Sequence, residues 1–162
     1  MNAAYDVVIV GGGLVGAALA AALAGTGLKI ALVEGRAPAK PPQDDGWDAR
    51  IYAISPGNAA FLERLGAWPG ADAGRIAPVY AMRVWGDDDR ARLDFDAYQS
   101  GVAQLAHIAE SRFLQEALWR VLCRQENLDL YAPAACAALE WFDTAAVLRL
   151  EDGRALEAKL VV

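Results

Sequence analysis

The sequence has very few residues that could hold a metal ion or form a disulfide framework. Among its 162 residues there is one histidine, His107, and there are two cysteines, Cys123 and Cys136. A single histidine disfavours a zinc site, and two cysteines without C-x-x-C spacing predict reduced thiols in a cytosol. His107 lies in an apolar stretch, where a structural role is favoured over that of a general base. The acidic run at 87–89 is interpreted as a charged hairpin tip, because no other ligand spacing accompanies it.

Basic residues and uninterrupted apolar runs are also scarce. Lys and Arg number 15 against 21 Asp and Glu, and the net charge of −6 argues against a nucleic-acid surface. The apolar N-terminus is broken by glycines at 11–13 and contains Asp6, so it is neither a secretory signal nor a membrane span. Hydrolase motifs such as G-x-S-x-G and H-E-x-x-H are missing. What remains, at 56% hydrophobic and 22% charged residues, predicts a globular domain with a substantial core.

The most informative segment runs from Tyr5 to Glu34. An apolar run (Tyr5–Val10) ends in G-x-G-x-x-G (Gly11, Gly13, Gly16), and an alanine-rich helical stretch and a second apolar run (Leu28–Val33) follow. Glycines allow a tight turn, a close approach of a pyrophosphate and close packing of helix on sheet. The segment therefore predicts a β-α-β dinucleotide-binding unit.

The helix start and the acid that closes this unit predict its ligand. The first turn, with Leu14 and Val15, presents backbone N–H groups and a partial positive charge to phosphates. Glu34 follows the first glycine by about 20 residues, where an acid accepts hydrogen bonds from a ribose. Its carboxylate also repels a 2′-phosphate, which favours FAD or NAD(H) over NADP(H).

The middle of the chain departs from a dehydrogenase pattern. A proline-rich loop (Ala37–Asp48) replaces the helix and parallel strand expected next, and a short apolar run (Ile51–Ile54) follows it. Ser55 and Pro56 predict a helix start, with the helix running to about Leu65 and Gly66 ending it. Strand patterns then return at three further places: Val79–Trp85 and Ala91–Asp96, which flank the hairpin tip Gly86–Arg90, and Gly101–Ile108.

The last third predicts one amphipathic helix and several strands. The helix extends from about Ser111 to Arg124, with Cys123 on its apolar face and so in the core. Asp152–Gly153 is typical of a hairpin turn. The chain stops on apolar residues 160–162 in mid-strand, from which we expect a piece of a longer protein. The predicted strands are Leu128–Tyr131, Cys136–Phe142, Ala145–Leu150 and Ala155–Val162.

Two arginines are candidate anion ligands. Arg50 precedes a strand, although from the residues alone a solvent-facing position after a loop is the favoured explanation. Arg112 stands at a helix start, which is unfavourable for a cation unless an anion lies nearby, and a frayed surface position is the alternative.

Four segments together resemble the FAD-dependent aromatic hydroxylases of the para-hydroxybenzoate hydroxylase type, within them the ubiquinone-biosynthesis hydroxylases. The first, DVVIVGGGLVGAALAAAL, is shared by many flavoproteins. The second and third are more specific, with D-A-R-x-Y-A-I-S-P in DARIYAISPGNAAFLERLGAW (Asp48–Trp68) and E-x-R-x-x-Q-x-A-L in HIAESRFLQEALW (His107–Trp119). The fourth is the final LEDGRALEAKLVV. The resemblance covers nearly the whole chain.

The resemblance implies which residues contact FAD. The glycines and first helical turn would bind the pyrophosphate, and Glu34 the adenosine ribose, with Arg36 near the adenosine half. Arg50 would contact the flavin side and Arg112 with Gln115 the ribityl–pyrophosphate region, while backbone near Cys136 would touch adenine. The full expected set is Gly11, Gly13, Leu14, Val15, Gly16, Glu34, Arg36, Arg50, Arg112, Gln115 and Cys136, with no metal ligand and no assigned catalytic residue.

The resemblance also implies the fold and its division. We expect an α/β, Rossmann-like β-α-β FAD-binding domain with added antiparallel β-ribbons, truncated before the second FAD motif. Residues 1–162 would form a partial FAD-binding domain: 1–78 hold the β-α-β unit, loop and helix. Residues 79–108 would be strands reaching into the substrate-side layer, and 109–162 a helix plus antiparallel ribbon.

The implied function is an FAD- and NAD(P)H-dependent monooxygenase that uses O₂ to hydroxylate a polyprenyl phenol or quinol ring in ubiquinone biosynthesis. The chain alone would hold part of the FAD site and lack activity. Such a substrate implies a cytoplasmic protein that works at the inner-membrane surface or with biosynthetic partners, and no nucleic acid. Two alternatives stay open: an NAD-linked dehydrogenase, and a dinucleotide-binding module without turnover.

Overall fold

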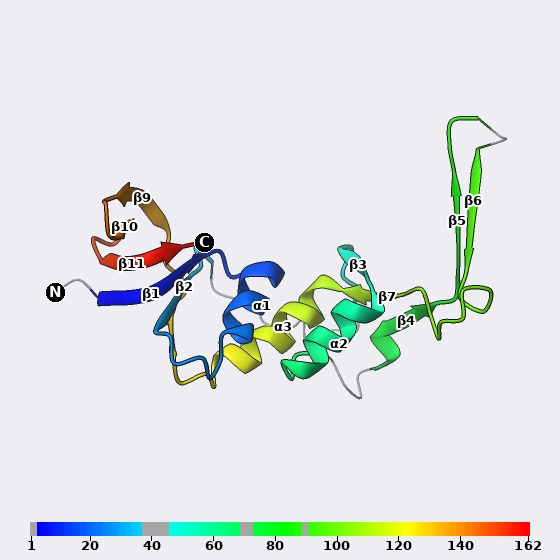
Figure 1. Cartoon of the computed structure of the whole chain (residues 1–162), viewed down its shortest axis with the longest axis horizontal. Coiled ribbons are helices and arrows are strands. Elements are labelled where there is room, and N and C mark those ends of the chain that lie inside the picture. The colour runs from blue at the N-terminus through cyan, green and yellow to red at the C-terminus, as the bar shows by residue number, and fades with distance from the viewer. Residues whose placement is uncertain (1–2, 37–45, 69–72, 89–90) are drawn as a thin grey trace. The chain divides into compact units, whose positions relative to one another are not determined.

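The computed structural model describes residues 3–36, 46–68, 73–88 and 91–162, with the elements in chain order shown in Figure 1. The chain divides into two compact units. The first contains Met1–Pro41 and Gln115–Val162, and the second contains Pro42–Leu114. Most of the predicted loop Ala37–Asp48, and Asp89 and Arg90 of the predicted hairpin tip, lie outside the described residues. The expected division at 78 and 108 stays a prediction.

The first unit is built on a six-stranded mixed sheet. Its four neighbouring strands β8, β2, β1 and β11 are parallel. Strand β10 pairs antiparallel with β11, and β9 pairs antiparallel with β10 at the edge of the sheet. All four residues of β2 are buried, as expected of a central parallel strand that is covered on both faces. The strands are β1 (Ala3–Val10), β2 (Ile30–Val33), β8 (Leu128–Tyr131), β9 (Cys136–Trp141), β10 (Ala146–Leu150) and β11 (Ala155–Val161).

The position of β8 differs from the sequence expectation. Leu128–Tyr131 was expected to belong with the antiparallel ribbon, but it pairs parallel to β2, with Ile30 opposite Leu128. The four parallel strands therefore follow the Rossmann order of third, second, first and fourth. A short apolar run does not reveal its partner or direction, because both depend on contacts with residues far away in the sequence.

The helices of the first unit are short and closely packed. Helix α1 (Leu14–Ala22) buries three alanines, Ala17, Ala20 and Ala21, whose small side chains let it approach the sheet closely. The boundary between the units falls within α3 (Ser111–Leu122), after Leu114. Cys123 follows α3 and is exposed, so the prediction that it lies in the core is wrong. The helix ends at Leu122, two residues before the predicted end, so Cys123 lies beyond the apolar face of the helix.

The second unit centres on a small antiparallel sheet. Its middle strand is β7 (Ala106–Glu110), flanked by β3 (Ile51–Ile54) and β4 (Ile76–Val79), with a short 3₁₀ turn (Ala73–Arg75) before β4. The strand expected at 101–108 thus begins later. Helix α2 (Pro56–Arg64) confirms the predicted caps. Its Ser55 hydroxyl accepts a hydrogen bond from Asn58 N–H at 3.3 Å, and Gly66, past its end, has φ +70°.

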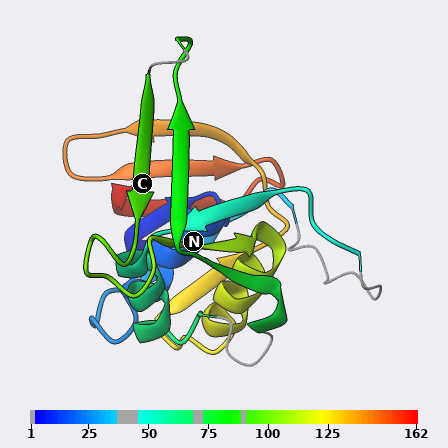
Figure 2. The ribbon, with the colours of Figure 1, turned by 90° about the vertical axis from the view of Figure 1, so that its right-hand side faces the viewer.

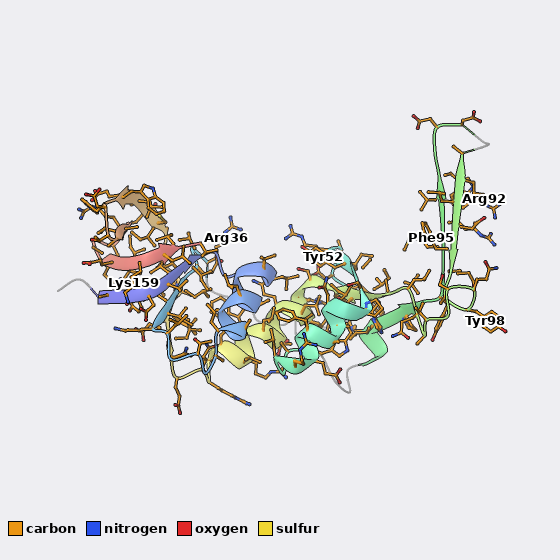
Figure 3. The ribbon with its side chains drawn as sticks, viewed as in Figure 1. Arg36, Tyr52, Arg92, Phe95, Tyr98 and Lys159 are labelled. Atoms are coloured by element: carbon orange, nitrogen blue, oxygen red, sulfur yellow. The ribbon has the colours of Figure 1, made fainter. Side chains whose placement is uncertain are left out.

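Strands β5 (Ala81–Trp85) and β6 (Arg92–Asp96) form the predicted hairpin, which stands clear of the rest of its unit in Figures 1 and 2. One face carries four apolar side chains, and the other carries ion pairs of Asp94 with Arg83 and Arg92. Phe95 and Arg92 are labelled in Figure 3. The apolar face of the hairpin consists of Met82, Val84, Leu93 and Phe95, all exposed.

None of the helices in the described ranges has the length and hydrophobicity to cross a bilayer.

Candidate dinucleotide-binding site

The turn between β1 and α1 depends on glycine at two positions. Gly11 has φ +111°, a conformation that side-chain-bearing residues rarely adopt, and its N–H donates to Val33 O at 2.8 Å. A Cβ on Gly16 would lie 2.0 Å from Gly11 O and 3.3 Å from Ile9 Cγ2. The turn can therefore close, and α1 can begin directly above it, only when these positions are glycine.

The start of α1 is open to a ligand. Gly13 is its extended N-cap residue without a side-chain cap, and the helical hydrogen bonds begin with Ala17 N–H to Gly13 O at 2.9 Å. The N–H groups of Leu14 and Val15 therefore precede the first helical bond and point out of the helix end. A Cβ on Gly13 would meet no atom within 4 Å. Backbone donors, the helix dipole and free space together suit an anionic group such as a pyrophosphate.

Glu34, at the end of β2, is held beside this turn. One carboxylate oxygen accepts Gly12 N–H at 2.6 Å, and the other accepts Arg36 N–H at 2.9 Å. Each carboxylate oxygen has two lone pairs, so each can still accept a hydroxyl of a ribose. The Arg36 side chain is exposed and extends away from the ribbon (Figure 3).

Helix α3 supplies two further contacts to the turn. Gln115 Nε2 lies 3.4 Å and Trp119 Nε1 lies 2.9 Å from the carbonyl oxygen of Gly12. Gln115 was among the expected site residues, whereas the sequence reasoning missed Trp119. The apolar spacing of α3 explained Trp119 as core, and the signal that could have found it is an indole N–H, which needs an acceptor when buried.

The segment that leads to Cys136 is tied to Glu34 through the backbone. Ala134 N–H donates to Glu34 O at 2.8 Å, after a cis peptide at Pro133. Cys136 itself begins β9 and is exposed. The structure thus brings this segment to the same strand end as the expected ribose ligand, while its contact with adenine stays a prediction.

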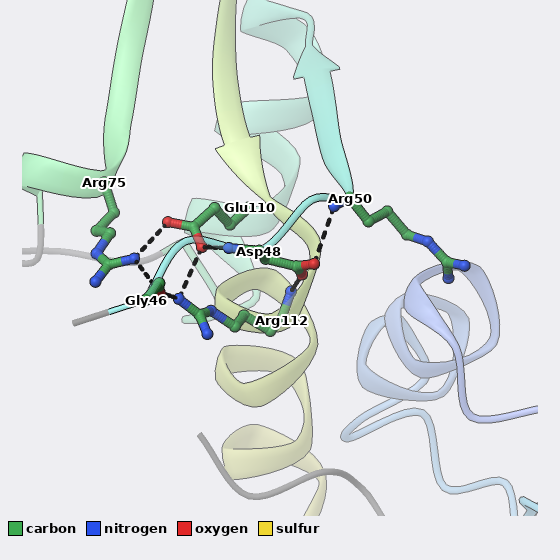
Figure 4. A network of polar contacts seen from close by, with 6 residues as sticks. All are labelled: Gly46, Asp48, Arg50, Arg75, Glu110 and Arg112. Carbon is green, nitrogen blue, oxygen red and sulfur yellow. Dashed lines mark hydrogen bonds and ion pairs between the residues drawn. The ribbon is translucent and has the colours of Figure 1, made fainter. Parts of the chain in front are cut away.

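The expected ligands Arg50 and Arg112 belong to the second unit, where they join a charged network (Figure 4). Asp48 accepts the N–H groups of Arg50 at 2.9 Å and Arg112 at 3.2 Å, so it caps the start of α3 from a distant part of the chain. Ser111 N–H donates to Arg50 O at 2.9 Å. The two most specific sequence motifs therefore bind each other directly.

Glu110 is the buried centre of this network, with a side chain 2% exposed. It forms ion pairs with Arg75 at 2.9 Å and Arg112 at 3.0 Å, and it accepts Asp48 N–H at 2.7 Å. Both guanidiniums also donate to Gly46 O. Burial alone would raise the pKa of the Glu110 carboxyl, but the bonds from Asp48 and Arg75 outweigh it and leave the pKa below its usual range.

The pKa of the Asp48 carboxyl is also lowered, chiefly through the hydrogen bond from Arg50 N–H in the same motif and to a smaller extent through that from Arg112 N–H. Arg112 is paired with the Glu110 carboxylate of the protein itself. This ion pair compensates the unfavourable position of a cation at a helix start. The Arg50 guanidinium points away from the network in Figure 4. The contact of either arginine with a cofactor stays a prediction.

The residues of the first unit fit a dinucleotide such as FAD. The open space at Gly13 admits a pyrophosphate, the first turn of α1 offers donors to it, and Glu34 keeps acceptor capacity for a ribose. Glu34 is the only acid among the turn and strand-end residues that we assign to the site, so a dinucleotide meets one fixed negative charge at the expected place. The site can bind and orient a cofactor through backbone donors.

Similar proteins are known. No protein-family profile matches the chain. It is 35% identical over 161 residues to 3-demethoxyubiquinol 3-hydroxylase of Escherichia coli (strain K12), covering 99% of this chain and 41% of that protein. It is 32% identical to ubiquinone hydroxylase UbiL of Rhodospirillum rubrum, covering 97% of this chain and 36% of that protein. It is 31% identical to mitochondrial ubiquinone biosynthesis monooxygenase COQ6 of Xenopus tropicalis, covering 99% of this chain and 37% of that protein. The chain spans about two fifths of the length of these relatives.

Solved structures share the fold. p-Nitrophenol 4-monooxygenase PnpA of Pseudomonas putida DLL-E4 matches with a TM-score of 0.71 at 18% identity, covering 99% of this chain and 40% of that one. PqsL of Pseudomonas aeruginosa, a probable FAD-dependent monooxygenase, matches with a TM-score of 0.70 at 22% identity, covering 98% of this chain and 41% of that one. The expected fold class is confirmed. Over nearly its whole length, the chain is similar in sequence to part of the ubiquinone hydroxylases and shares the fold of the corresponding part of FAD-dependent monooxygenases.

Proposed function

We propose that the chain supplies the FAD-binding part of a monooxygenase that hydroxylates a phenol or quinol ring in ubiquinone biosynthesis. The observation that carries this proposal is 35% identity to a demethoxyubiquinol hydroxylase over 99% of the chain. The glycine turn adds independent support, because its open helix start and acidic strand end suit a dinucleotide. A dehydrogenase would share that turn, but the relatives named above are hydroxylases or monooxygenases of ubiquinone biosynthesis.

The residues of the first unit would hold the adenosine and pyrophosphate part of FAD. Backbone N–H groups from Gly13 to Gly16 would donate to the phosphates, and Gly11 would keep the turn tight. Glu34 would accept the ribose hydroxyls, with Arg36 beside the adenosine half. Gln115 would lie by the pyrophosphate, and backbone near Cys136 by the adenine.

As the resemblance implies, Arg50 would contact the flavin side of the cofactor, and Arg112 with Gln115 its ribityl–pyrophosphate region. Asp48 and Glu110 hold the Arg112 backbone and guanidinium, so this side chain is fixed before any cofactor arrives. Arg50, whose guanidinium points away from that network, retains its charge for an anionic group of the cofactor.

FAD, when bound and reduced by NAD(P)H, supplies the chemistry that activates O₂ for transfer to the ring. The described residues then bind and orient the cofactor, and we assign none of them a proton-transfer role. The substrate class is an electron-rich aromatic ring. One structural neighbour was solved with 2-aminobenzoylacetate, which supports an aromatic ligand. A prenylated substrate would bring the protein to the inner-membrane surface or to partners that carry it, from the cytoplasmic side.

Two measurements test the proposal. Titration of FAD with the chain, followed by flavin fluorescence, should give saturable binding, with FAD preferred over FMN, which has no adenosine half. The complete open reading frame that encodes this chain should restore ubiquinone synthesis in cells that lack 3-demethoxyubiquinol 3-hydroxylase. Binding without restoration, together with NADH oxidation coupled to a small hydroxy acid or carbonyl, would favour the dehydrogenase alternative instead.

A further inference from the structure

Gly12, the middle residue of the glycine turn, is held through both of its backbone polar groups by side chains. Its N–H donates to Glu34 Oε2 at 2.6 Å, and its carbonyl oxygen accepts Trp119 Nε1–H at 2.9 Å. Gln115 Nε2 approaches the same oxygen at 3.4 Å. The turn is therefore fixed from β2 on one side and from α3 on the other.

Trp119 also fills the space beside Gly12. Its side chain is 6% exposed, and a Cβ on Gly12 would lie 2.6 Å from Trp119 Cζ2 and 3.0 Å from Glu34 Cβ. Any apolar residue at position 119 would satisfy the spacing of α3, but only tryptophan adds a ring N–H at the end of an apolar side chain. Without that donor, a largely buried carbonyl would lose its best partner, which is costly.

The position of Gly12 controls the ligand-binding groups that follow it. Gly13 caps α1 and leads directly into the N–H groups of its first turn. A rotation at Gly12 would move these donors away from a common target, because consecutive peptide groups share the same backbone. Glu34 couples this fixation to ribose binding, since each of its carboxylate oxygens accepts one backbone N–H and keeps a second lone pair.

We propose that Trp119 is a positioning residue for the dinucleotide. It acts with Glu34 to hold the glycine turn in the conformation that receives the pyrophosphate. The identity of the ligand as FAD rests on the proposed function, whereas the hold of Trp119 on Gly12 is a property of the chain by itself.

The first test needs no ligand. Trp119→Phe keeps an aromatic ring and removes the N–H donor to Gly12 O, so the turn loses one of the hydrogen bonds that hold it closed. The amide hydrogen of Gly12, which donates to Glu34 in the same turn, should therefore exchange with solvent about tenfold faster. The exchange rate of the Leu148 amide, which lies on the buried strand β10 of the six-stranded sheet, should not change. Trp141→Phe is the matched control, because Trp141 is exposed on β9 in the same unit.

The second test measures binding, with ADP as the probe for the adenosine and pyrophosphate half. Trp119→Phe should weaken ADP binding about tenfold relative to Trp141→Phe, at a temperature well below the melting temperatures of both variants. Unchanged Gly12 exchange together with unchanged ADP affinity overturns the proposal. Faster exchange in a protein whose wild type binds neither ADP nor FAD upholds the hold on the turn and overturns the proposed cofactor.

A measurement on the wild-type chain remains decisive if Trp119→Phe does not fold. The indole N–H of Trp119 should be protected from exchange, and that of the exposed Trp141 should not. Equal, rapid exchange of both indole hydrogens overturns the proposal.

Discussion

The turn between β1 and α1 offers backbone N–H groups and almost no side-chain charge, whereas the start of α3 in the second unit is surrounded by carboxylates and guanidiniums. At the turn, the one carboxylate, Glu34, accepts backbone donors only. At the start of α3, Glu110 pairs with Arg75 and Arg112, and Asp48 caps the helix.

This difference bears on what each region can bind. An anion at the glycine turn meets backbone donors and no ion pair of the described residues, because the first N–H groups of α1 have no partner within the helix. An anion at Arg112 must compete with the carboxylate of Glu110. Among the two arginines expected at the cofactor, we therefore expect Arg50 to be the better anion ligand, because Arg112 is already paired with Glu110.

Gly16→Ala should have the largest effect, on both stability and binding. The new Cβ would lie 2.0 Å from Gly11 O, a backbone atom that cannot move without opening the turn. We expect a loss of about 3 kcal/mol in the free energy of unfolding and no measurable FAD binding. Denaturant unfolding and an FAD titration measure both. Gly57→Ala in α2, where a Cβ meets no atom within 4 Å, is the control and should be neutral or stabilising.

Glu110→Gln should rank second and act on stability. It leaves two partly buried guanidiniums without their shared counter-charge, for an expected loss of about 2–4 kcal/mol in the free energy of unfolding. Glu116→Gln, which breaks an exposed pair with Arg120, is the matched control and should cost about 0.5 kcal/mol or less. Equal effects of the two substitutions would show that the network does not stabilise the second unit.

Arg50→Ala should leave stability unchanged and weaken FAD binding by more than about tenfold, because it removes an exposed cation from the flavin side. The FAD dissociation constant of the complete protein measures this effect, with the melting temperature as the check on folding. Arg64→Ala, at the exposed end of α2, serves as the control for loss of one positive charge. An unchanged dissociation constant in Arg50→Ala would remove Arg50 from the site.

Acid should produce the smallest effect. The pKa values of the Asp48 and Glu110 carboxyls lie below their usual range in the folded chain, so the unfolded chain binds more protons as the pH falls. Their stabilisation is complete above pH about 5 and is lost progressively below pH about 4. Unfolding measured from pH 7 to 3 should show a shallower acid decline in Glu110→Gln than in the wild type. Parallel curves would contradict the assignment of this decline to Glu110.

The local elements could be predicted from the sequence because their signals are local. The β1–α1–β2 unit, the Ser55 cap of α2 and the Gly66 stop depend on residues that are neighbours in the chain. The parallel pairing of β8 with β2 could not be predicted, since it joins strands separated by the whole second unit.

The candidate site shows the same limit. Gly11, Gly13, Gly16 and Glu34 follow from the motif spacing alone. Glu110 looks like an ordinary charge before a helix, and Trp119 looks like core, until the fold brings Asp48 and Gly12 to them. Side chains that act by holding a distant backbone group leave little signal in a single sequence.

The most direct test of the central claim is the FAD affinity of Gly13→Ala. A Cβ at this position meets no protein atom, so stability should change by less than about 1 kcal/mol, while the methyl group occupies the space expected for the pyrophosphate. The account predicts a dissociation constant for FAD at least about tenfold higher than that of the wild type, at an unchanged melting temperature. Equal FAD affinity in the two proteins would show that the glycine turn is not the dinucleotide site.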